Sequence, residues 1–266
     1  MNCFTFLKRL IISPFPKKNV PAPERELLEL LFDTPELHFR SEQETFWYEL
    51  LFGEKNTAPA FTSKGSIRII QFNIQQADYP EETYSEWKTA LLSFFNSDSI
   101  LLELSRSYGL IIEPLSDSML GEAELEAVAD TLFSDFFLPV KFFMGLFHSK
   151  NPKLRAIFEE ERALFDLSSE RPIETVETAS LAPLASSLKN SPIAAELVQL
   201  FIDDETLKPL IETLYKNQGN ISLTAKDLYM HRNSIQYRLD KFQEQTNLSL
   251  RKPSGLLFAY LCTRIA

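Results

Sequence analysis

Residues 217–248, NQGNISLTAKDLYMHRNSIQYRLDKFQEQTNL, decide the fold of the C-terminal part of this chain. The stretch reads as two short helices joined by a tight turn, because its small and apolar residues recur at offsets that let one helix pack across the next. These residues are Ala225, Leu228, Met230, Ile235 and Leu239. Their spacing predicts a helix-turn-helix, in which the small Ala225 lies where the two helices approach most closely.

The boundaries of the two helices follow from local signals. The first helix is expected to begin after Gly219-Asn220, with the Ser222 hydroxyl accepting a hydrogen bond from an unpaired backbone amide. The turn is expected at residues 229–231, with Met230 dipping into the core. The second helix is predicted to run from about residue 232 to about residue 245.

The second helix separates an apolar face from a polar face. An advance of about 100° per residue from Ile235 places Leu239 and Phe242 on the same side, which forms the packed face. The side chains that point away from this face are Asn233, Ser234, Gln236, Tyr237 and Lys241. Amide side chains match adenine edges, and hydroxyls and a cation match phosphates or bases. We therefore expect this helix to read the major groove of double-stranded DNA.

Three charged residues complete the description of this helix. Arg232 projects from the helix N-terminus, the end that usually lies nearest the bases. Arg238 lies beside the packed face, and the sequence leaves open whether it contacts a phosphate or forms a structural ion pair. Asp240 points outward, which indicates that the helix leaves the DNA by its third turn. The predicted DNA-binding residues are Arg232, Asn233, Ser234, Gln236, Tyr237, Arg238 and Lys241.

Three short motifs in this stretch resemble a known family. The motifs are Ala225-Lys226-Asp227-Leu228, His231-Arg232-Asn233-Ser234 and Tyr237-Arg238-Leu239. They look like the C-terminal helix-turn-helix of PucR/CdaR-type bacterial transcriptional regulators, with its A-x-x-L, HRNT and YRL pattern. Ser234 replaces the threonine and keeps the hydroxyl, and residues 247–250 with the apolar helix at 255–265 are similar to the family's closing elements. The resemblance implies a cytoplasmic DNA-binding regulator without enzymatic activity, and a homodimer is expected by analogy with proteins that read paired half-sites.

The distribution of charge agrees with one DNA-binding domain at the C-terminus. The whole chain of 266 residues has a formal net charge of −10, which does not by itself suggest a nucleic-acid partner. Residues 207–266, however, contain nine Lys or Arg and four acids, a net charge of +5, which leaves −15 for the rest. A small basic domain attached to an acidic remainder is expected where only that domain meets phosphate.

The cysteines and histidines do not suggest a metal or a cofactor. Cys3 and Cys262 lie near opposite ends of the chain, and His38, His148 and His231 have no ligand partners at short spacing. Free cysteines are typical of a reduced cytoplasmic interior. The first 18 residues form an apolar run that Lys8 and Arg9 interrupt and that is too short to span a bilayer, so no membrane association is expected.

The middle of the chain changes to alternating apolar patterns, which predict an α+β domain. Strands are predicted at residues 66–74, 99–104, 109–113 and 140–148, and helices at 81–95 and 121–137. This βαββαβ order forms a four-stranded antiparallel sheet with two helices on one face, the ferredoxin-like arrangement.

The element order and the position of this segment look like the degenerate GGDEF-like domain that precedes the helix-turn-helix in CdaR-type regulators. A working cyclase of that class needs a Gly-Gly-acid-acid-Phe hairpin, whereas residues 105–109 read Ser-Arg-Ser-Tyr-Gly. Cyclase chemistry is therefore not expected, although a nucleotide-binding role of the sheet remains an alternative. RNA-binding sheets share the element order, but the central strands here are aliphatic and the region is acidic.

We expect four segments along the chain. They are an N-terminal helical segment at 1–65 with helices at 24–32 and 42–52, the GGDEF-like domain at 66–150, a helical connector at 151–203 and the DNA-binding domain at 204–266. The connector is expected to begin with a charged helix at 151–165, in which Glu159 to Arg162 form a solvated face. A hinge is expected at 166–191, and a short helix at 179–188 within it is left open. Further helices are expected at 192–202 and 205–217.

Two questions stay open at the level of sequence. Family members often sense a small molecule through an N-terminal domain, and residues 1–65 are too short for such a domain, so an effector is unidentified. A protein-interaction scaffold, whose helix-turn-helix packs on a partner chain instead of DNA, is the second alternative to the regulator.

Overall fold

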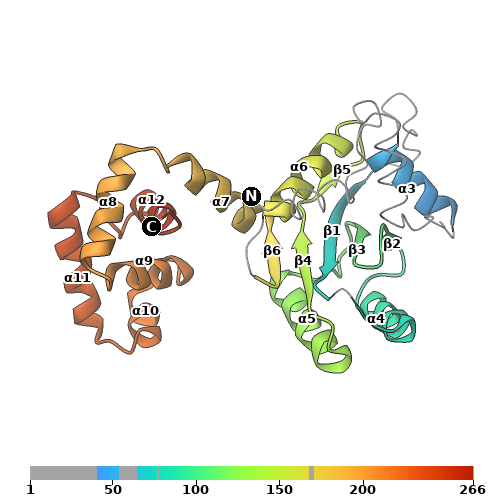
Figure 1. The fold of residues 1–266 in the computed structure, drawn as a ribbon, viewed down its shortest axis with the longest axis horizontal. Coiled ribbons are helices and arrows are strands. Elements are labelled where there is room, and N and C mark those ends of the chain that lie inside the picture. The colour runs from blue at the N-terminus through green and yellow to red at the C-terminus, as the bar shows by residue number, and fades with distance from the viewer. Residues whose placement is uncertain (1–40, 54–64, 77, 168–170, 266) are drawn as a thin grey trace. The chain divides into compact units, whose positions relative to one another are not determined.

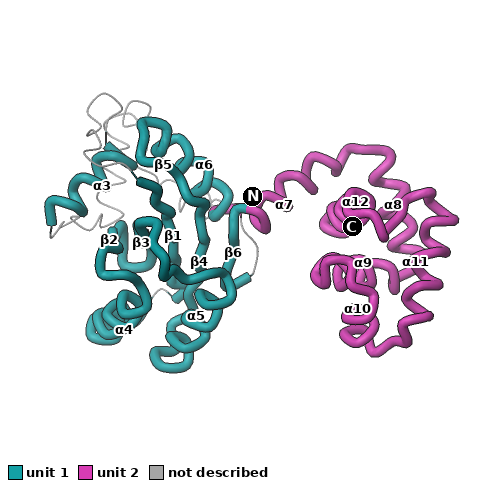
Figure 2. The backbone as a smooth tube through the Cα atoms, turned by 180° about the vertical axis from the view of Figure 1, so that it is seen from behind, with its two compact units in different colours: residues 1–165, 170–176 teal, residues 166–169, 177–266 magenta. Residues whose placement is uncertain are grey.

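The computed structural model describes residues 41–53, 65–76, 78–167 and 171–265. The chain divides into two compact units, shown as a ribbon in Figure 1 and in two colours in Figure 2. Unit 1 comprises residues 1–165 and 170–176, and unit 2 comprises residues 166–169 and 177–266. The helix predicted at 24–32 and the N-terminal run of 18 residues lie outside the described residues.

Unit 1 is a mixed α+β structure built on one sheet. Its elements are α3 (Glu42–Phe52), β1 (Ser66–Ile74), α4 (Glu81–Ser93), β2 (Ile100–Glu103), β3 (Tyr108–Pro114), α5 (Glu122–Phe136), β4 (Val140–Met144), β5 (His148–Ser149), α6 (Leu154–Leu167) and β6 (Ile173–Thr175). The strands predicted at 66–74, 99–104 and 109–113 and the two predicted helices are present, with small differences at their ends. The single strand predicted at 140–148 is instead divided into β4 and β5. The α+β class of this part of the chain is therefore confirmed.

The sheet is larger than the sequence predicted. Strands β2, β3, β1 and β4 follow one another in that order and pair antiparallel, as the βαββαβ arrangement requires. Strand β6 then adds parallel to β4, and β5 pairs antiparallel with β1, which gives a six-stranded mixed sheet. The prediction of a four-stranded antiparallel sheet was wrong on this point, because a strand of three residues leaves too short a pattern to recognise.

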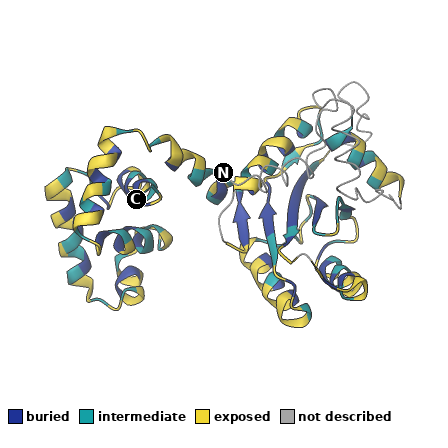
Figure 3. Cartoon of the chain, in the orientation of Figure 1, coloured by how far each residue is buried: buried dark blue, intermediate teal, exposed yellow. Residues whose placement is uncertain are grey.

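One face of the sheet carries the main core of unit 1. Helices α4 and α5 cover it, and the central strands β1 and β3 are almost wholly buried (Figure 3). Phe72 on β1 lies at the centre, with its ring centroid 5.4 Å from that of Trp87 on α4 and 6.3 Å from that of Phe142 on β4. Offset aromatic contacts of this kind stabilise a core beyond the area that they bury.

The other face of the sheet is covered as well. Side chains alternate along a strand, so Phe143 points to the face opposite Phe142. There Phe165 of α6 lies 5.7 Å from Phe143 and 6.4 Å from Tyr108, measured between ring centroids. The expectation of helices on one face only was therefore incomplete, because α6 covers the second face.

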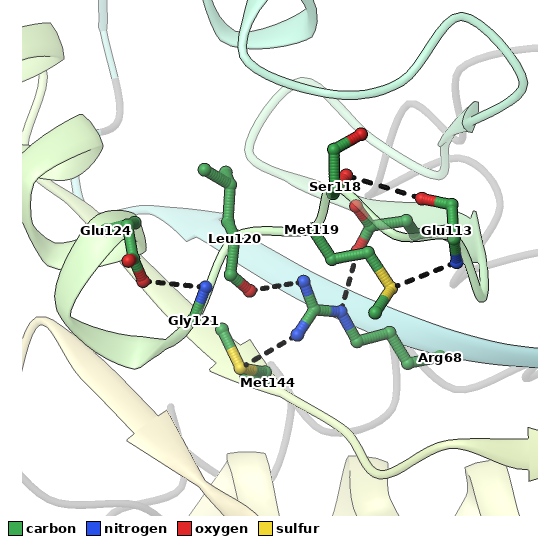
Figure 4. Close-up of polar contacts among 9 residues, drawn as sticks. Arg68, Glu113, Ser118, Met119, Leu120, Gly121, Glu124 and Met144 are labelled. Carbon is green, nitrogen blue, oxygen red and sulfur yellow. Dashed lines mark hydrogen bonds and ion pairs between the residues drawn. The ribbon is translucent and has the colours of Figure 1, made fainter.

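Arg68 forms a buried ion pair within the sheet and a hydrogen bond to the segment before α5. Arg68 on β1 is 4% exposed and Glu113 on β3 is 1% exposed. The Arg68 Nε atom lies 2.7 Å from a Glu113 carboxylate oxygen, and its guanidinium also donates to the Leu120 carbonyl at 2.5 Å and to the Met144 sulfur at 3.3 Å (Figure 4). These partners together satisfy a charge that would be costly to bury alone.

Helix α6 buries an acid that was expected to face solvent. Glu161 was predicted to lie on a solvated face, but it is 4% exposed. Its Oε1 atom lies 2.8 Å from His148 Nε2 and accepts a hydrogen bond of 2.9 Å from the Leu146 amide. Burial raises the pKa of Glu161 above its ordinary value, and the hydrogen bond with His148 opposes that shift. The prediction was wrong because a run of charges in a sequence does not show which of them a neighbouring strand covers.

Unit 2 is entirely helical in its described part. Its helices are α7 (Val176–Ser187), α8 (Pro192–Asp203), α9 (Leu207–Lys216), α10 (Ile221–Asp227), α11 (Arg232–Thr246) and α12 (Pro253–Thr263). The stretch 166–191, predicted as a hinge with a short helix left open at 179–188, holds β6 and α7 where the structure describes it. No helix of the described chain is long and apolar enough to span a membrane.

Candidate nucleic-acid interface

Helix α10 is the first helix of the predicted helix-turn-helix, and its start is fixed by Asn220. The Asn220 side chain accepts hydrogen bonds of 3.1 Å from the amides of Ser222 and Leu223. The predicted cap, Ser222, instead lies within the first turn. Asparagine is as good an N-cap as serine, and here it occupies the extended position that a cap requires.

The turn between α10 and α11 has the predicted position and packing. Ala225 is buried at the crossing, and Leu228 and Met230 pack against the same core while partly buried. The Met230 amide donates to the Ala225 carbonyl at 2.8 Å, and the Tyr229 amide donates to the Lys226 carbonyl at 3.1 Å. These two bonds close the end of α10 and set the entry into α11.

Helix α11 is anchored by the apolar stripe that the sequence predicted. Ile235, Leu239 and Phe242 are fully buried in the core of unit 2, which they share with α8, α9 and α12. The helix begins at the cap His231, whose Nδ1 atom accepts a hydrogen bond of 3.2 Å from the Asn233 amide. It ends one residue later than predicted, at Thr246. The buried stripe fixes which face of the helix is presented outward.

The residues predicted to contact DNA all lie on α11. Arg232, Asn233, Tyr237 and Lys241 are exposed, and Tyr237 retains 67% of its accessible surface. Ser234, Gln236 and Arg238 are partly buried. The helix therefore presents an amide, a phenol and a lysine outward and an arginine at its exposed N-terminal end, and these groups can donate to base edges and to phosphate oxygens.

Arg238 has a partner within unit 2. Its guanidinium donates a hydrogen bond to the Thr206 hydroxyl in the turn before α9. The same hydroxyl bonds to the Asp204 carboxylate at 2.5 Å, and this hydrogen bond lowers the pKa of Asp204, with a smaller contribution from the charge of Arg238. The sequence left open a phosphate contact or a structural ion pair; the contact found is a hydrogen bond to a neutral hydroxyl, and the phosphate contact stays a prediction.

Asp240 is also paired. Its carboxylate lies 2.5 Å from the guanidinium of Arg251, in the segment between α11 and α12. Pairing reduces the repulsion that an exposed acid on this helix would exert on phosphate.

Two residues of the turn were placed by the sequence but given no role in binding. In its neutral form His231 carries its proton on Nε2, because Nδ1 is the acceptor in the cap, so an exposed donor stands beside Arg232. Tyr229 is 98% exposed. The sequence feature that could have indicated a binding role for His231 and Tyr229 is their position directly before the second helix. That position indicates such a role only when the capping hydrogen bond and the exposure of the side chains are known.

The described residues include no group of three or more His, Cys, Asp or Glu side chains that could hold a metal ion.

Comparison with known proteins supports this assignment of the helices. Residues 207–265 match the family model for the PucR C-terminal helix-turn-helix domain. The chain is 29% identical over 251 residues to the uncharacterized protein YxkF of Bacillus subtilis (strain 168), which covers 89% of this chain and 82% of the relative. It is 27% identical over 254 residues to a leucine-rich protein of Streptococcus dysgalactiae subsp. equisimilis, with coverages of 93% and 86%.

A third relative is the purine catabolism regulatory protein of Bacillus subtilis (strain 168), 27% identical over 224 residues. That match covers 82% of this chain and 37% of the relative, so the relative is much longer. On the strength of these matches, and of a helix-turn-helix built as the family motifs predict, this chain carries a PucR C-terminal helix-turn-helix domain at residues 207–265 and is distantly homologous to the purine catabolism regulatory protein.

Proposed function

We propose that this protein is a sequence-specific DNA-binding transcriptional regulator that reads the major groove with α11. The observation that carries the proposal is the division of this helix into two faces. Ile235, Leu239 and Phe242 hold one face rigidly in the core, and Arg232 with its neighbours is presented on the other. A binding constellation on a helix that packing fixes is positioned more accurately than one on a loop.

The contacts that we assign follow from side-chain chemistry. Asn233 and Gln236 supply amides for base edges, and Arg232 supplies a guanidinium at the end of the helix that enters the groove. Ser234, Tyr237 and Lys241 supply donors to phosphate oxygens or to bases. The net charge of +5 over residues 207–266 adds the attraction to phosphate that is independent of sequence.

The proposal extends to the assembly and to the sheet domain. We infer a homodimer, because helix-turn-helix regulators read paired half-sites. We infer a cytoplasmic location, because that compartment contains the DNA and keeps thiols reduced. We assign no enzymatic chemistry and no cofactor to the chain. The GGDEF-like identity of unit 1 rests on its element order and its place before the helix-turn-helix, and it remains part of the proposal.

The proposal is tested by fluorescence anisotropy of the full-length protein on pooled genomic fragments of its source organism at two salt concentrations. The variant Arg232→Ala, Asn233→Ala removes a basic residue and an amide from the exposed face. The matched control Lys189→Ala, Asn190→Ala likewise removes a basic residue and an amide, from an exposed turn between α7 and α8.

Selective, salt-sensitive binding that the first variant loses and the control keeps is the expected result. Equal binding by all three proteins would contradict reading by α11. Absence of binding by the wild type at low salt, with no small molecule restoring it, would contradict the regulator and favour the scaffold.

A further inference from the structure

Tyr229 occupies a backbone position that suits glycine. Its φ angle is +53°, in the left-handed region. The Met230 amide bonds to the Ala225 carbonyl and the Tyr229 amide bonds to the Lys226 carbonyl, which is the hydrogen-bond pattern that closes a helix with a left-handed residue. Glycine adopts this conformation without strain, whereas the Cβ of a tyrosine does not fit it freely. The tyrosine is therefore strained relative to a glycine at the same place.

The side chain of Tyr229 receives no compensation within the described part of the chain. It is 98% exposed, and no hydrogen bond or ring contact is found for it among the described residues. The other aromatic residue with a left-handed backbone, Phe137 at φ +55°, differs because its ring lies 6.4 Å from that of Phe133. A large residue that is both strained and without internal contacts indicates a function outside the folded chain.

The neighbours of Tyr229 indicate which partner it meets. His231, Arg232 and Asn233 are exposed at the start of α11, and Lys226 is exposed on the last turn of α10. Helices α10 and α11 follow one another in Figure 1. Asp227, the one acid within four residues of Tyr229 in the sequence, is already bonded to the side-chain amide of Asn217 at 3.0 Å. Basic and donor groups on both sides favour an anionic partner, and a tyrosine hydroxyl is a common donor to phosphate.

We propose that Tyr229 contacts the DNA backbone, with its hydroxyl donating to a phosphate oxygen next to the bases that α11 reads. This inference rests on the proposed function and adds a positioning residue from the turn, outside the recognition helix. The contact fixes how far the N-terminal end of α11 enters the groove, because phosphate contacts set register and orientation on the duplex.

Two variants separate the strain of the backbone from the contact of the side chain. Tyr229→Gly relieves the strain, so it should raise the melting temperature of unit 2 by a few degrees. The same variant should weaken binding to the operator, the DNA fragment selected in the anisotropy experiment, by about tenfold. A tenfold loss is the effect of losing one hydrogen bond to a charged group. Tyr229→Phe keeps the ring and the strain, so it should leave the melting temperature unchanged and lose most of the same affinity. Gln218→Gly is the matched control, since Gln218 is exposed with φ +52° in the turn before α10 and should gain stability without losing affinity.

The measurements are made on the full-length protein. Both tryptophans, Trp47 and Trp87, belong to unit 1, so tryptophan fluorescence follows that unit and far-UV circular dichroism reveals the remaining transition. Operator affinity of Tyr229→Gly equal to that of the wild type would overturn the inference while the proposed function stands. Loss of dimer with unchanged binding to a single half-site would overturn it by assigning Tyr229 to a contact between copies. Absence of DNA binding by the wild type would overturn both proposals.

Discussion

Arg238 on α11 donates a hydrogen bond to the Thr206 hydroxyl, which joins α11 to the turn before α9. The hydroxyl is itself held by the Asp204 carboxylate. This chain of three side chains positions α11 from its edge, in addition to the apolar stripe that holds it from beneath.

Removal of the Arg238 side chain should therefore act mainly on stability. Arg238→Ala is expected to lower the free energy of unfolding of unit 2 by about 1 kcal/mol or less, because the hydrogen bond is partly exposed. The salt dependence of DNA binding should stay the same, because the guanidinium is not assigned to a phosphate. Chemical denaturation followed by circular dichroism and a salt titration of operator binding check the two expectations. If Arg238→Ala instead reduces the slope of log affinity against log salt by about one and leaves stability unchanged, Arg238 contacts a phosphate.

Lys241 should show the opposite behaviour. It is exposed on the third turn of α11, with no hydrogen bond or ion pair found among the described residues. Lys241→Ala is expected to leave unfolding unchanged and to reduce the slope of log affinity against log salt by about 0.9, the loss of one phosphate contact. Lys241→Arg retains the charge and serves as the control with an unchanged slope. An unaltered slope in the alanine variant would remove Lys241 from the interface.

The free energy of unfolding of unit 1 should depend on pH because of Glu161. Burial raises the pKa of this carboxyl above its ordinary value of 4.5, so the folded unit holds the proton more tightly than the unfolded chain. The free energy of unfolding should therefore fall as pH rises from about 4.5 through the raised pKa, and the contribution of Glu161 should then become constant. Urea titrations followed by tryptophan fluorescence measure this decline.

Glu161→Gln should flatten that decline, because the amide cannot lose a proton in this range. Glu126→Gln, an exposed acid on α5, is the control that should leave the pH profile as in the wild type. His148 and Glu160 are the titratable neighbours that act on the pKa of Glu161, and both are kept in these variants. A profile that Glu161→Gln does not alter would show that this carboxyl is not the source of the pH dependence.

Gly255 allows the N-terminus of α12 to lie against the preceding segment. A Cβ atom added at this position would collide with the Ser249 carbonyl oxygen, which belongs to the backbone and cannot rotate away. Gly255→Ala is expected to cost unit 2 about 1–3 kcal/mol, the range for inserting atoms into a packed site. Ser254→Ala, at the exposed neighbouring position, should be neutral. Unchanged thermal unfolding of Gly255→Ala would show that the two segments separate freely.

The helix-turn-helix was predictable from sequence because its signals are local. The spacing of Ile235, Leu239 and Phe242 follows the helical period, and all three are buried on one side of α11. The end of the helix differs by one residue, and the cap of α10 is Asn220 where Ser222 was predicted. Two residues with similar capping chemistry, separated by one position, cannot be distinguished as the cap without the backbone conformation.

The features that the sequence did not predict depend on distant parts of the chain. Strand β6 exists because Ile173 to Thr175 pair with β4, which lies about 30 residues earlier in the sequence. Glu161 is buried because the segment from Leu146 to His148 lies over it. Neither the pairing of β6 with β4 nor the burial of Glu161 produces a periodic pattern in the sequence. Both can therefore be recognised only in the folded structure.

The measurement that tests the central proposal most directly is dimethyl sulfate protection of the selected operator by the full-length protein. The reagent methylates guanine N7, which lies in the major groove, and adenine N3, which lies in the minor groove. We predict protection of guanine N7 in two half-sites about 10 base pairs apart. This protection should be lost in the Arg232→Ala, Asn233→Ala variant and kept in the Lys189→Ala, Asn190→Ala control. Protection confined to adenine N3, or guanine protection that the first variant retains, would contradict reading of the major groove by α11.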